Sequence, residues 1–284
     1  MKFRKIIYGV VAFGLVVLII CGVVVWNLLE YKDIKVAFLN IGQGDSILIS
    51  RGSQQILIDG GPDGTKLMEQ LGKQMPFWDR NIEIVIATHP DGDHIDGLIS
   101  VFKNYSVNQF WHTNANKGTS VYDTLIKYAE KEKNVTDVIA YKGLQADFGN
   151  NMHLDIIYPF EDDVNNIQDA NDTSIVATLT LGDEVFYFGG DLPSKIEDIL
   201  PLGDKITVLK AGHHGSKSST SKVFLQKIKP RDVVISVGKG NHYGHPHKRV
   251  LQDIKEIGAK IFRTDEQGTI VYHCDKDCII TLEK

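Results

Sequence analysis

The sequence predicts an α/β domain that follows a single N-terminal transmembrane helix. Residues 6–29 contain no charged residue, and about 20 consecutive apolar residues are enough to cross a bilayer as a helix. After residue 33, short runs rich in Val and Ile alternate with segments of helical apolar spacing. Such alternation is typical of mixed sheets with helices on their outer faces. We therefore expect a cytoplasmic N-terminus and membrane anchor at residues 1–32, and one soluble domain at residues 33–284.

The charges around the apolar run predict which side of the membrane holds the domain. Lys2, Arg4 and Lys5 precede the run, whereas Glu30 and Asp33 follow it. Because positive charge favours the cytoplasmic side, we expect a single-pass protein of the cell membrane with its domain extracellular. A cleaved signal peptide is the alternative. It is disfavoured because bulky residues, rather than the small residues of a cleavage site, continue to the end of the run.

The first half of the domain begins with three predicted strands, at residues 34–42, 45–50 and 54–61. Gly, Asp and Ser residues between them are typical of tight turns. Helices are then expected at residues 65–75, 95–105 and 120–133, the last with a charged outer face. Between them lie a buried strand at residues 81–89 and another strand at residues 107–113.

The second half predicts four more strands and then a regular alternation of strands and helices. The four strands are expected at residues 137–143, 153–159, 174–182 and 184–191. The alternation comprises strands at 205–212, 232–240 and 260–265, with helices at 221–229 and 248–258. A hairpin over residues 269–284 closes the chain.

That hairpin carries two cysteines that face each other across its turn. Cys274 and Cys278 flank residues 275–277, so a disulfide could form in an oxidising compartment. Two free thiols are an alternative, as is a zinc site with His273, although no second ligand pair lies nearby in the sequence.

Charge is unevenly distributed along the domain. The formal net charge is only −5, so the whole chain shows no general attraction to nucleic acid. Residues 205–260, however, contain twelve Lys or Arg against three Asp or Glu. This segment forms either a solvated surface or an anion-binding face, and the sequence favours neither.

A dense polar cluster follows the buried strand that ends near residue 87. His89, Asp91, Asp93 and His94 form an H-x-D-x-D-H pattern. Two imidazoles and two carboxylates at this density suit one or two divalent ions with mixed nitrogen and oxygen ligands. The alternative is a polar turn between a strand and a helix, capped by Asp.

Further polar residues follow other predicted strands. They are Asp59, Asp191, the pair His213 and His214, and the loop residues His242, His245 and His247. Because all follow strands, these clusters predict one active-site rim.

The series FLNIGQGDSILI, LIDGG, THPDGDHIDG, NDTSIV, FGGDL, AGHHGS and YGHP resembles the metallo-β-lactamase superfamily. Within it, the chain is similar to the extracellular metal-dependent domain of ComEC, the DNA-uptake channel of competent bacteria, from about Val36 to Thr269. The resemblance implies an αββα sandwich. The full channel carries many membrane helices and this chain has one, so a role in DNA uptake does not follow automatically.

The resemblance also implies a two-metal centre that holds zinc or manganese. It places His89 and Asp91 on one ion, Asp93 and His94 on the other, and Asp191 as the bridging carboxylate. The late histidine ligand would be His213 or His214, and both stay open. Asn171 stands where the family usually has a histidine ligand, which makes the first site weaker or oxygen-richer. Asp59 would support the ligand loop, with Ser174 beside the site.

Two divalent ions about 3.5–4 Å apart can share a water and lower its pKa towards neutrality. We therefore expect hydrolysis by a metal-bridged hydroxide, with Asp93 among the catalytic residues. Lys217 and hydroxyls such as Ser216 could hold phosphate oxygens. His245, in its YGHP setting, could donate to a substrate oxygen or protonate a leaving group.

The leading functional prediction is a membrane-anchored, outward-facing phosphodiesterase or nuclease that acts on single-stranded DNA. One alternative is a cell-surface phosphodiesterase on envelope polymers or phosphorylcholine, which would need aromatics near the metals. Trp78, Trp111, Tyr122 and Tyr243 are the candidates for such a cage. The other alternative is a non-catalytic surface binding module with a relic metal site.

Overall fold

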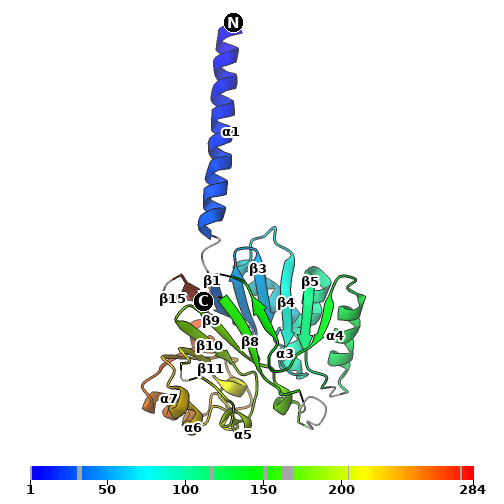
Figure 1. The fold of residues 1–284 in the computed structure, drawn as a ribbon, viewed down its shortest axis with the longest axis vertical. Coiled ribbons are helices and arrows are strands. Elements are labelled where there is room, and N and C mark those ends of the chain that lie inside the picture. The colour runs from blue at the N-terminus through cyan, green and yellow to red at the C-terminus, as the bar shows by residue number, and fades with distance from the viewer. Residues whose placement is uncertain are drawn as a thin grey trace.

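The computed structural model describes residues 2–30, 34–115, 118–149, 152–161, 169–203, 205–275 and 277–284. Two sheets pack face to face with helices on both outer faces (Figure 1). The predicted αββα sandwich is therefore confirmed. The predicted boundary between anchor and domain, between residues 32 and 33, lies outside the described residues.

The first sheet has the strand order β15-β14-β1-β2-β3-β4-β5-β6. β1 lies antiparallel between β2 and β14, whereas β3, β4, β5 and β6 run parallel. Its strands are β1 (Ile34–Phe38), β2 (Ile47–Arg51), β3 (Gln54–Ile58), β4 (Asn81–Ala87), β5 (Ser106–His112), β6 (Thr136–Ile139), β14 (Thr269–Cys274) and β15 (Cys278–Glu283).

The second sheet has the order β13-β12-β11-β10-β9-β8-β7. β10, β11, β12 and β13 are parallel, and the hairpins of β7, β8 and β9 complete the sheet. Its strands are β7 (Gln145–Asp147), β8 (Met152–Tyr158), β9 (Val176–Leu181), β10 (Glu184–Phe188), β11 (Val208–Lys210), β12 (Asp232–Ile235) and β13 (Lys260–Arg263).

Helices cover the outer face of each sheet because each buries one apolar side. α2 (Gly64–Gln74), α3 (Gly92–Asn104) and α4 (Ser120–Lys131) pack on the first sheet. α5 (Ser194–Glu197), α6 (Lys222–Ile228) and α7 (Lys248–Glu256) pack on the second. The short helices η1 (Asn171–Thr173), η2 (Gly212–Gly215) and α8 (Thr264–Gln267) lie in loops.

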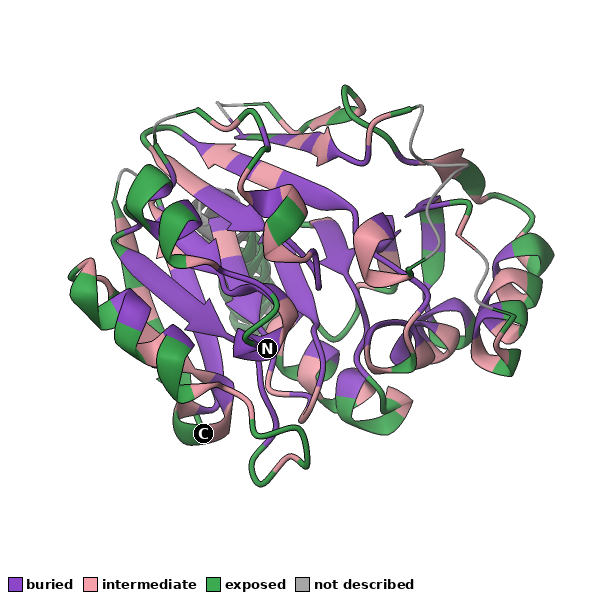
Figure 2. Cartoon of the chain, turned by 90° about the horizontal axis from the view of Figure 1, so that it is seen from below, coloured by how far each residue is buried: buried purple, intermediate pink, exposed green. Residues whose placement is uncertain are grey.

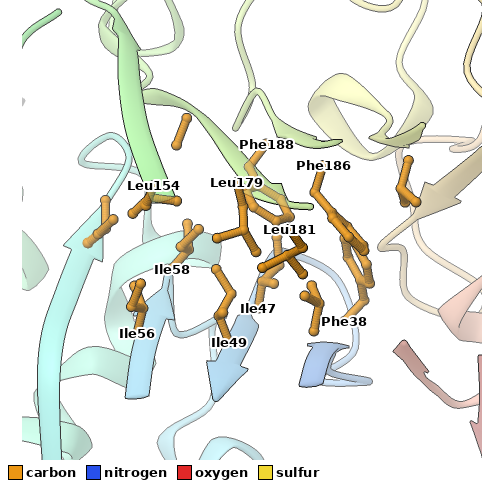
Figure 3. Close-up of a cluster of buried hydrophobic side chains, with 14 of the residues drawn as sticks. Phe38, Ile47, Ile49, Ile56, Ile58, Leu154, Leu179, Leu181, Phe186 and Phe188 are labelled. Atoms are coloured by element: carbon orange, nitrogen blue, oxygen red, sulfur yellow. The ribbon is translucent and has the colours of Figure 1, made fainter. Parts of the chain in front are cut away.

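The main core lies between the two sheets. Ile47 and Ile49 of the first sheet face Leu179 and Phe186 of the second (Figure 3). Burial of each such side chain stabilises the fold by about 1.5–3 kcal/mol. Figure 2 shows the result: buried strands enclosed by helices whose outward faces are exposed.

α1 (Lys2–Glu30) contains the stretch Arg4–Val24, which has a mean hydropathy of 2.8 and is not buried against the domain. Its length and composition are sufficient to cross a membrane. Only residues 31–33 separate α1 from β1. At the end of the sheet where β1 begins, a disulfide joins Cys274 to Cys278.

Candidate metal centre

The polar loops converge at one end of the two sheets, beyond the carboxyl ends of the parallel strands. Asp59 follows β3, residues 88–91 connect β4 with α3, and Asp93 and His94 lie in the first turn of α3. Asp191 follows β10, and the loop that includes η2 begins after Lys210, the last residue of β11. Ligand sites in α/β sheets are typically built at such strand ends.

Four buried residues form what we call the inner cluster: Asp45, His94, Asp191 and His214. Each offers a ligand atom that lies within 4.8 Å of the other three. Nε2 of His94 is 3.3 Å from Asp191 Oδ1, and Nε2 of His214 is 3.6 Å from Asp191 Oδ2. Nδ1 of His214 lies 3.3 Å from Asp45 Oδ1 and 3.1 Å from the backbone oxygen of Ser236. Two imidazoles and two carboxylates therefore surround one small volume.

This arrangement fits a divalent cation. The Nε2 atoms of His89, His94 and His214 are buried and make no hydrogen bond, and neither does Asp191 Oδ1. A buried polar atom without a partner is costly. All three nitrogens lie within 4.0 Å of an Asp191 oxygen, so a cation with mixed nitrogen and oxygen ligands would satisfy them together. Zinc and manganese both accept such donors.

Asp59 holds two of these histidines in place. Its Oδ2 accepts from His94 Nδ1 at 2.7 Å and from the hydroxyl of Thr88 at 2.7 Å. Its Oδ1 accepts from the Thr88 N–H at 2.8 Å. The Thr88 hydroxyl in turn lies 3.0 Å from His89 Nδ1. With both Nδ1 atoms occupied in this way, both Nε2 atoms are directed towards Asp191 and are the atoms that would bind a metal.

Lys210 and Asp45 belong to the site and were missed in the sequence analysis. Lys210 is fully buried, and its Nζ forms an ion pair with Asp45. Nζ also donates to the backbone oxygen of Gly190 at 3.0 Å and lies 4.0 Å from Asp191 Oδ1. A charged residue in an otherwise apolar strand was the available signal for Lys210. The charge in GQGDS was the signal for Asp45, although its partner could not be deduced from the sequence.

Two further predicted ligands, His89 and His213, also lie near Asp191, and together with Asn171 we call them the outer group. Asp91, the other predicted ligand of this loop, directly precedes α3. Nε2 of His213 lies 3.5 Å from Asp191 Oδ2, and its Nδ1 lies 3.4 Å from the Asn171 amide and 3.3 Å from the Ser218 hydroxyl. The His213 side chain is 28% exposed, against 1% for His214. The structure thus separates the two adjacent histidines: His214 lies in the inner cluster and His213 faces Asn171.

An unusual backbone sends these two histidines in different directions. His213 and His214 have φ values of 47° and 54°, in the left-handed region that side chains rarely adopt. Glu197 and Thr220 hold the loop in this form. The Thr220 N–H donates to Glu197 Oε2 at 2.5 Å, and the Gly212 N–H donates to the Thr220 hydroxyl at 2.7 Å. The N–H and the hydroxyl of Thr220 are therefore both engaged in hydrogen bonds that stabilise the loop.

The electrostatics of the centre favour a bound cation. Burial alone would lower the pKa of His94 and His214, but the nearby Asp191 carboxylate and its neighbours raise both, that of His214 to about 9. Burial, followed by repulsion from His94, lowers the pKa of His89 to about 3. Without metal, the carboxylates thus favour the protonated form of both imidazoles.

Asp93 and Ser174 flank the inner cluster. Asp93 Oδ2 lies 3.3 Å from His214 Nε2, and its side chain is one-third exposed at the mouth of the site. The buried Ser174 hydroxyl accepts from the Asp191 N–H at 3.2 Å. The Asp93 carboxylate is therefore close to His214 and also accessible to solvent. Ser174 positions the backbone that carries Asp191.

His245, Ser216 and Lys217 lie along the rim. The His245 ring is 5.6 Å from that of His213, and burial, with this neighbour next, lowers the pKa of His245 to about 4. His245 is therefore neutral at pH 7 and would act as a neutral N–H donor. The Ser216 hydroxyl lies 2.9 Å from that of Ser218, and Lys217 is exposed.

The basic segment 205–260 does not form one continuous face. Lys222 and Arg231 pair with acidic side chains, and Lys210 is internal. Lys217 and Lys239 are exposed on loops that follow β11 and β12, at the end that holds the centre. Only part of the segment is thus available to attract an anion to the site.

Comparison with known proteins agrees with this geometry. A sequence model of the metallo-beta-lactamase superfamily matches residues 39–239. ComE operon protein 3 of Bacillus subtilis is 30% identical over 89% of this chain and 35% of its own length. Recombination protein 2 of Haemophilus influenzae is 28% identical over 91% of this chain and 31% of its own length. These matches confirm the predicted resemblance, and the chain spans about a third of the length of these relatives.

A solved structure shares the fold. The metallo-beta-lactamase fold protein YhfI from Bacillus subtilis superimposes with a TM-score of 0.58 and covers 86% of this chain and 100% of its own. The two sequences are 12% identical. This likeness shows the architecture alone.

Proposed function

Because the chain belongs to the metallo-β-lactamase superfamily, we propose that it is a membrane-anchored metal-dependent phosphodiesterase that acts on single-stranded DNA outside the cell. One observation carries the proposal. Three buried imidazole Nε2 atoms without hydrogen bonds surround the Asp191 carboxylate. A non-catalytic relic has no need to keep such costly groups buried and aimed at one point.

The positions of the residues around the centre suggest the role of each in catalysis. Divalent ions held by the inner cluster and the outer group would activate a water and neutralise charge on a phosphodiester. Asp191 would contribute to both positions, since its Oδ1 faces His94 and its Oδ2 faces His213 and His214. Asp93, at the mouth, is placed to orient the attacking water. His245, as a neutral imidazole, is placed to donate a hydrogen bond to the leaving oxygen.

Two features support a nucleic-acid substrate. Tyr243 is 68% exposed, and its ring stacks on that of His245 at 5.8 Å. An exposed ring beside the site offers a face on which a nucleobase can stack. Lys217 and Lys239 are exposed at the same end and would attract phosphates in a salt-dependent way. The predicted similarity to competence proteins agrees with this choice of substrate.

The aromatic side chains argue against a phosphorylcholine site. Recognition of a quaternary ammonium group uses a cage of several aromatic faces. Trp111 and Tyr122 are buried in the cores on the two faces of the first sheet, and Trp78 lies in the loop before β4, away from the centre. Of the four candidates, only Tyr243 stands beside the site.

A cleavage assay tests the proposal. The full chain in detergent, loaded with manganese or zinc, is incubated with a labelled single-stranded oligonucleotide and with bis-p-nitrophenyl phosphate. We expect cleavage of both, abolished by Asp191→Asn and retained by Asp183→Asn, a matched change at an exposed carboxylate paired with Lys205. Cleavage of the small ester alone would reject DNA as the substrate. Cleavage of neither by metal-loaded protein would reject the phosphodiesterase.

A further inference from the structure

Two large apolar side chains project from the loop between α2 and β4. Phe77 is 80% exposed and Trp78 is 65% exposed, and their rings form an edge-to-face pair at 4.8 Å. Neither ring belongs to a core cluster of the described residues. Contiguous exposed apolar surface of this kind can mark a site of contact with a protein or a membrane.

Strand register places this pair at the end of the domain where the anchor enters. Ile34, the first residue of β1, pairs with Arg51, which pairs in turn with Gln54 at the start of β3. β4 runs parallel to β3 and begins at Asn81, directly after the aromatic loop. Three strand spacings of about 4.8 Å separate β1 from β4, so the loop lies about 14 Å to one side of the chain entry. In Figure 1 the cyan connection before β4 rises on the same side as α1.

A third exposed apolar residue lies on the opposite flank of the anchor. Ile279 of β15 is 70% exposed and pairs with His273, which also pairs with Lys35 of β1. It is therefore two strands from β1 in the other direction. The entry of the anchor lies between Ile279 and the aromatic pair, along one edge of the domain.

We propose that Phe77 and Trp78 insert into the interface of the lipid bilayer that α1 crosses, with Ile279 as a secondary contact. This inference rests on the proposed membrane anchoring. Residues 31–33 can span only about 11 Å, so this edge of the domain is held near the bilayer surface. Trp and Phe partition favourably to that depth, and the adjacent exposed Arg80 suits lipid phosphates.

The contact would fix the orientation of the domain. The aromatic pair and Ile279 would contact the bilayer on opposite sides of the anchor. These two contacts would resist tilting of the domain within the plane of its first sheet. β4 has seven residues, about 23 Å at 3.3 Å per residue, and the candidate metal centre lies beyond its other end. The centre would thus be held facing the aqueous phase, where a long polymer can reach it without meeting the bilayer.

Fluorescence quenching in vesicles tests the contact on the full chain. The chain has three tryptophans. Trp26→Phe removes the one within α1, and Trp111 is buried, so Trp78 is the exposed reporter. We expect phosphatidylcholine brominated near the head group to quench most of the Trp78 emission. In the same background, Trp78→Phe should abolish the quenching. Tyr243→Trp added to Trp26→Phe and Trp78→Phe, which moves the reporter to the end with the metal centre, should show none.

Flotation of the same vesicles separates this inference from the anchoring on which it rests. Protein that does not float with the vesicles would overturn both. Protein that floats while Trp78 emits equally in brominated and plain vesicles would overturn the lipid contact alone. A blue shift of Trp78 without bromine quenching would assign the pair to contact with a protein chain, which also overturns the proposal.

Discussion

The inner cluster and the outer group share Asp191 but differ in how firmly their residues are held. Every inner side chain is buried, and Lys210, Asp59 and backbone oxygens support them. In the outer group His89 is buried and held through Thr88, but His213 is partly exposed and faces the Asn171 amide. One position is therefore rigid and rich in strong ligands, whereas the other is more open.

This difference suggests a division of roles between the two positions. A preorganised set of ligands loses little entropy on binding and should retain its ion. A more open set with an amide in place of an imidazole should bind its ion weakly. The outer position is then the one at which substrate and metal can exchange. The predictions below test this contrast, from the largest expected effect to the smallest.

Replacement of the two neighbouring histidines should give unequal losses. His214→Ala removes an inner ligand and is expected to lower kcat/KM for phosphodiester cleavage by about 10³-fold or more. His213→Ala should cost only about 10–100-fold, because its neighbours and added metal can compensate. Steady-state kinetics at saturating manganese measure both. Equal losses would remove the distinction between the two positions.

Lys210→Met should destabilise the domain as well as inactivate it. The substitution leaves Asp45 and Asp191 buried without their cation, which is expected to lower the free energy of unfolding by about 3–5 kcal/mol. Urea denaturation of the metal-free protein measures the loss. Adding Asp45→Asn to the Lys210→Met variant should restore part of it, because one of the unpaired charges is then removed. A double variant less stable than the single would contradict the ion-pair account.

Asp59→Asn should weaken metal binding without removing a ligand. The carboxylate accepts with one oxygen from His94 and the Thr88 hydroxyl and with the other from the Thr88 N–H. An amide must turn its NH₂ group towards one of these donors, so the imidazole loses its orientation. Loss of such support typically costs 10–100-fold in metal affinity, and we expect about this reduction. The matched control is Asp63→Asn, which alters the exposed cap of α2 away from the centre. Equal affinity in both variants would show that Asp59 has no supporting role.

Metal affinity should rise with pH, most steeply until His214 loses its proton. Asp191 and its neighbours raise the pKa of His214 to about 9 and also raise that of His94, although burial opposes both shifts. A cation must displace these protons, so affinity should grow about tenfold per pH unit for each displaced proton, and less steeply above about pH 9, where His214 is already neutral. Calorimetric titration between pH 6.5 and 9.5 measures the slope. A slope of zero would mean that both imidazoles are already neutral.

The sequence predicted the strands and most of the residues that the structure brings together at the candidate site, because both follow local patterns. Apolar runs fixed the strands, and the polar residues after them identified the end of the sheets that holds the centre. The αββα arrangement came from the family resemblance. Short elements such as β7 and α5 were not predicted, since three or four residues give no period to detect.

What escaped prediction depended on contacts between distant segments. Asp45 and Lys210 are 165 positions apart, and each alone is one charge near a strand. The choice between His213 and His214 depended on two left-handed backbone conformations that the letters HH do not reveal. The basic segment 205–260 is continuous in the sequence, but its alternating strands and helices place some bases in ion pairs and Lys210 in the interior.

The most direct test is the number and strength of bound metal ions. Native mass spectrometry of the full chain, titrated with manganese, should show one ion bound at low concentration and a second only at much higher concentration. His214→Ala should lose the tight ion, and His213→Ala the weak one. Saturation at a single ion, or loss of the tight ion in His213→Ala, would contradict a centre built from one rigid and one open position.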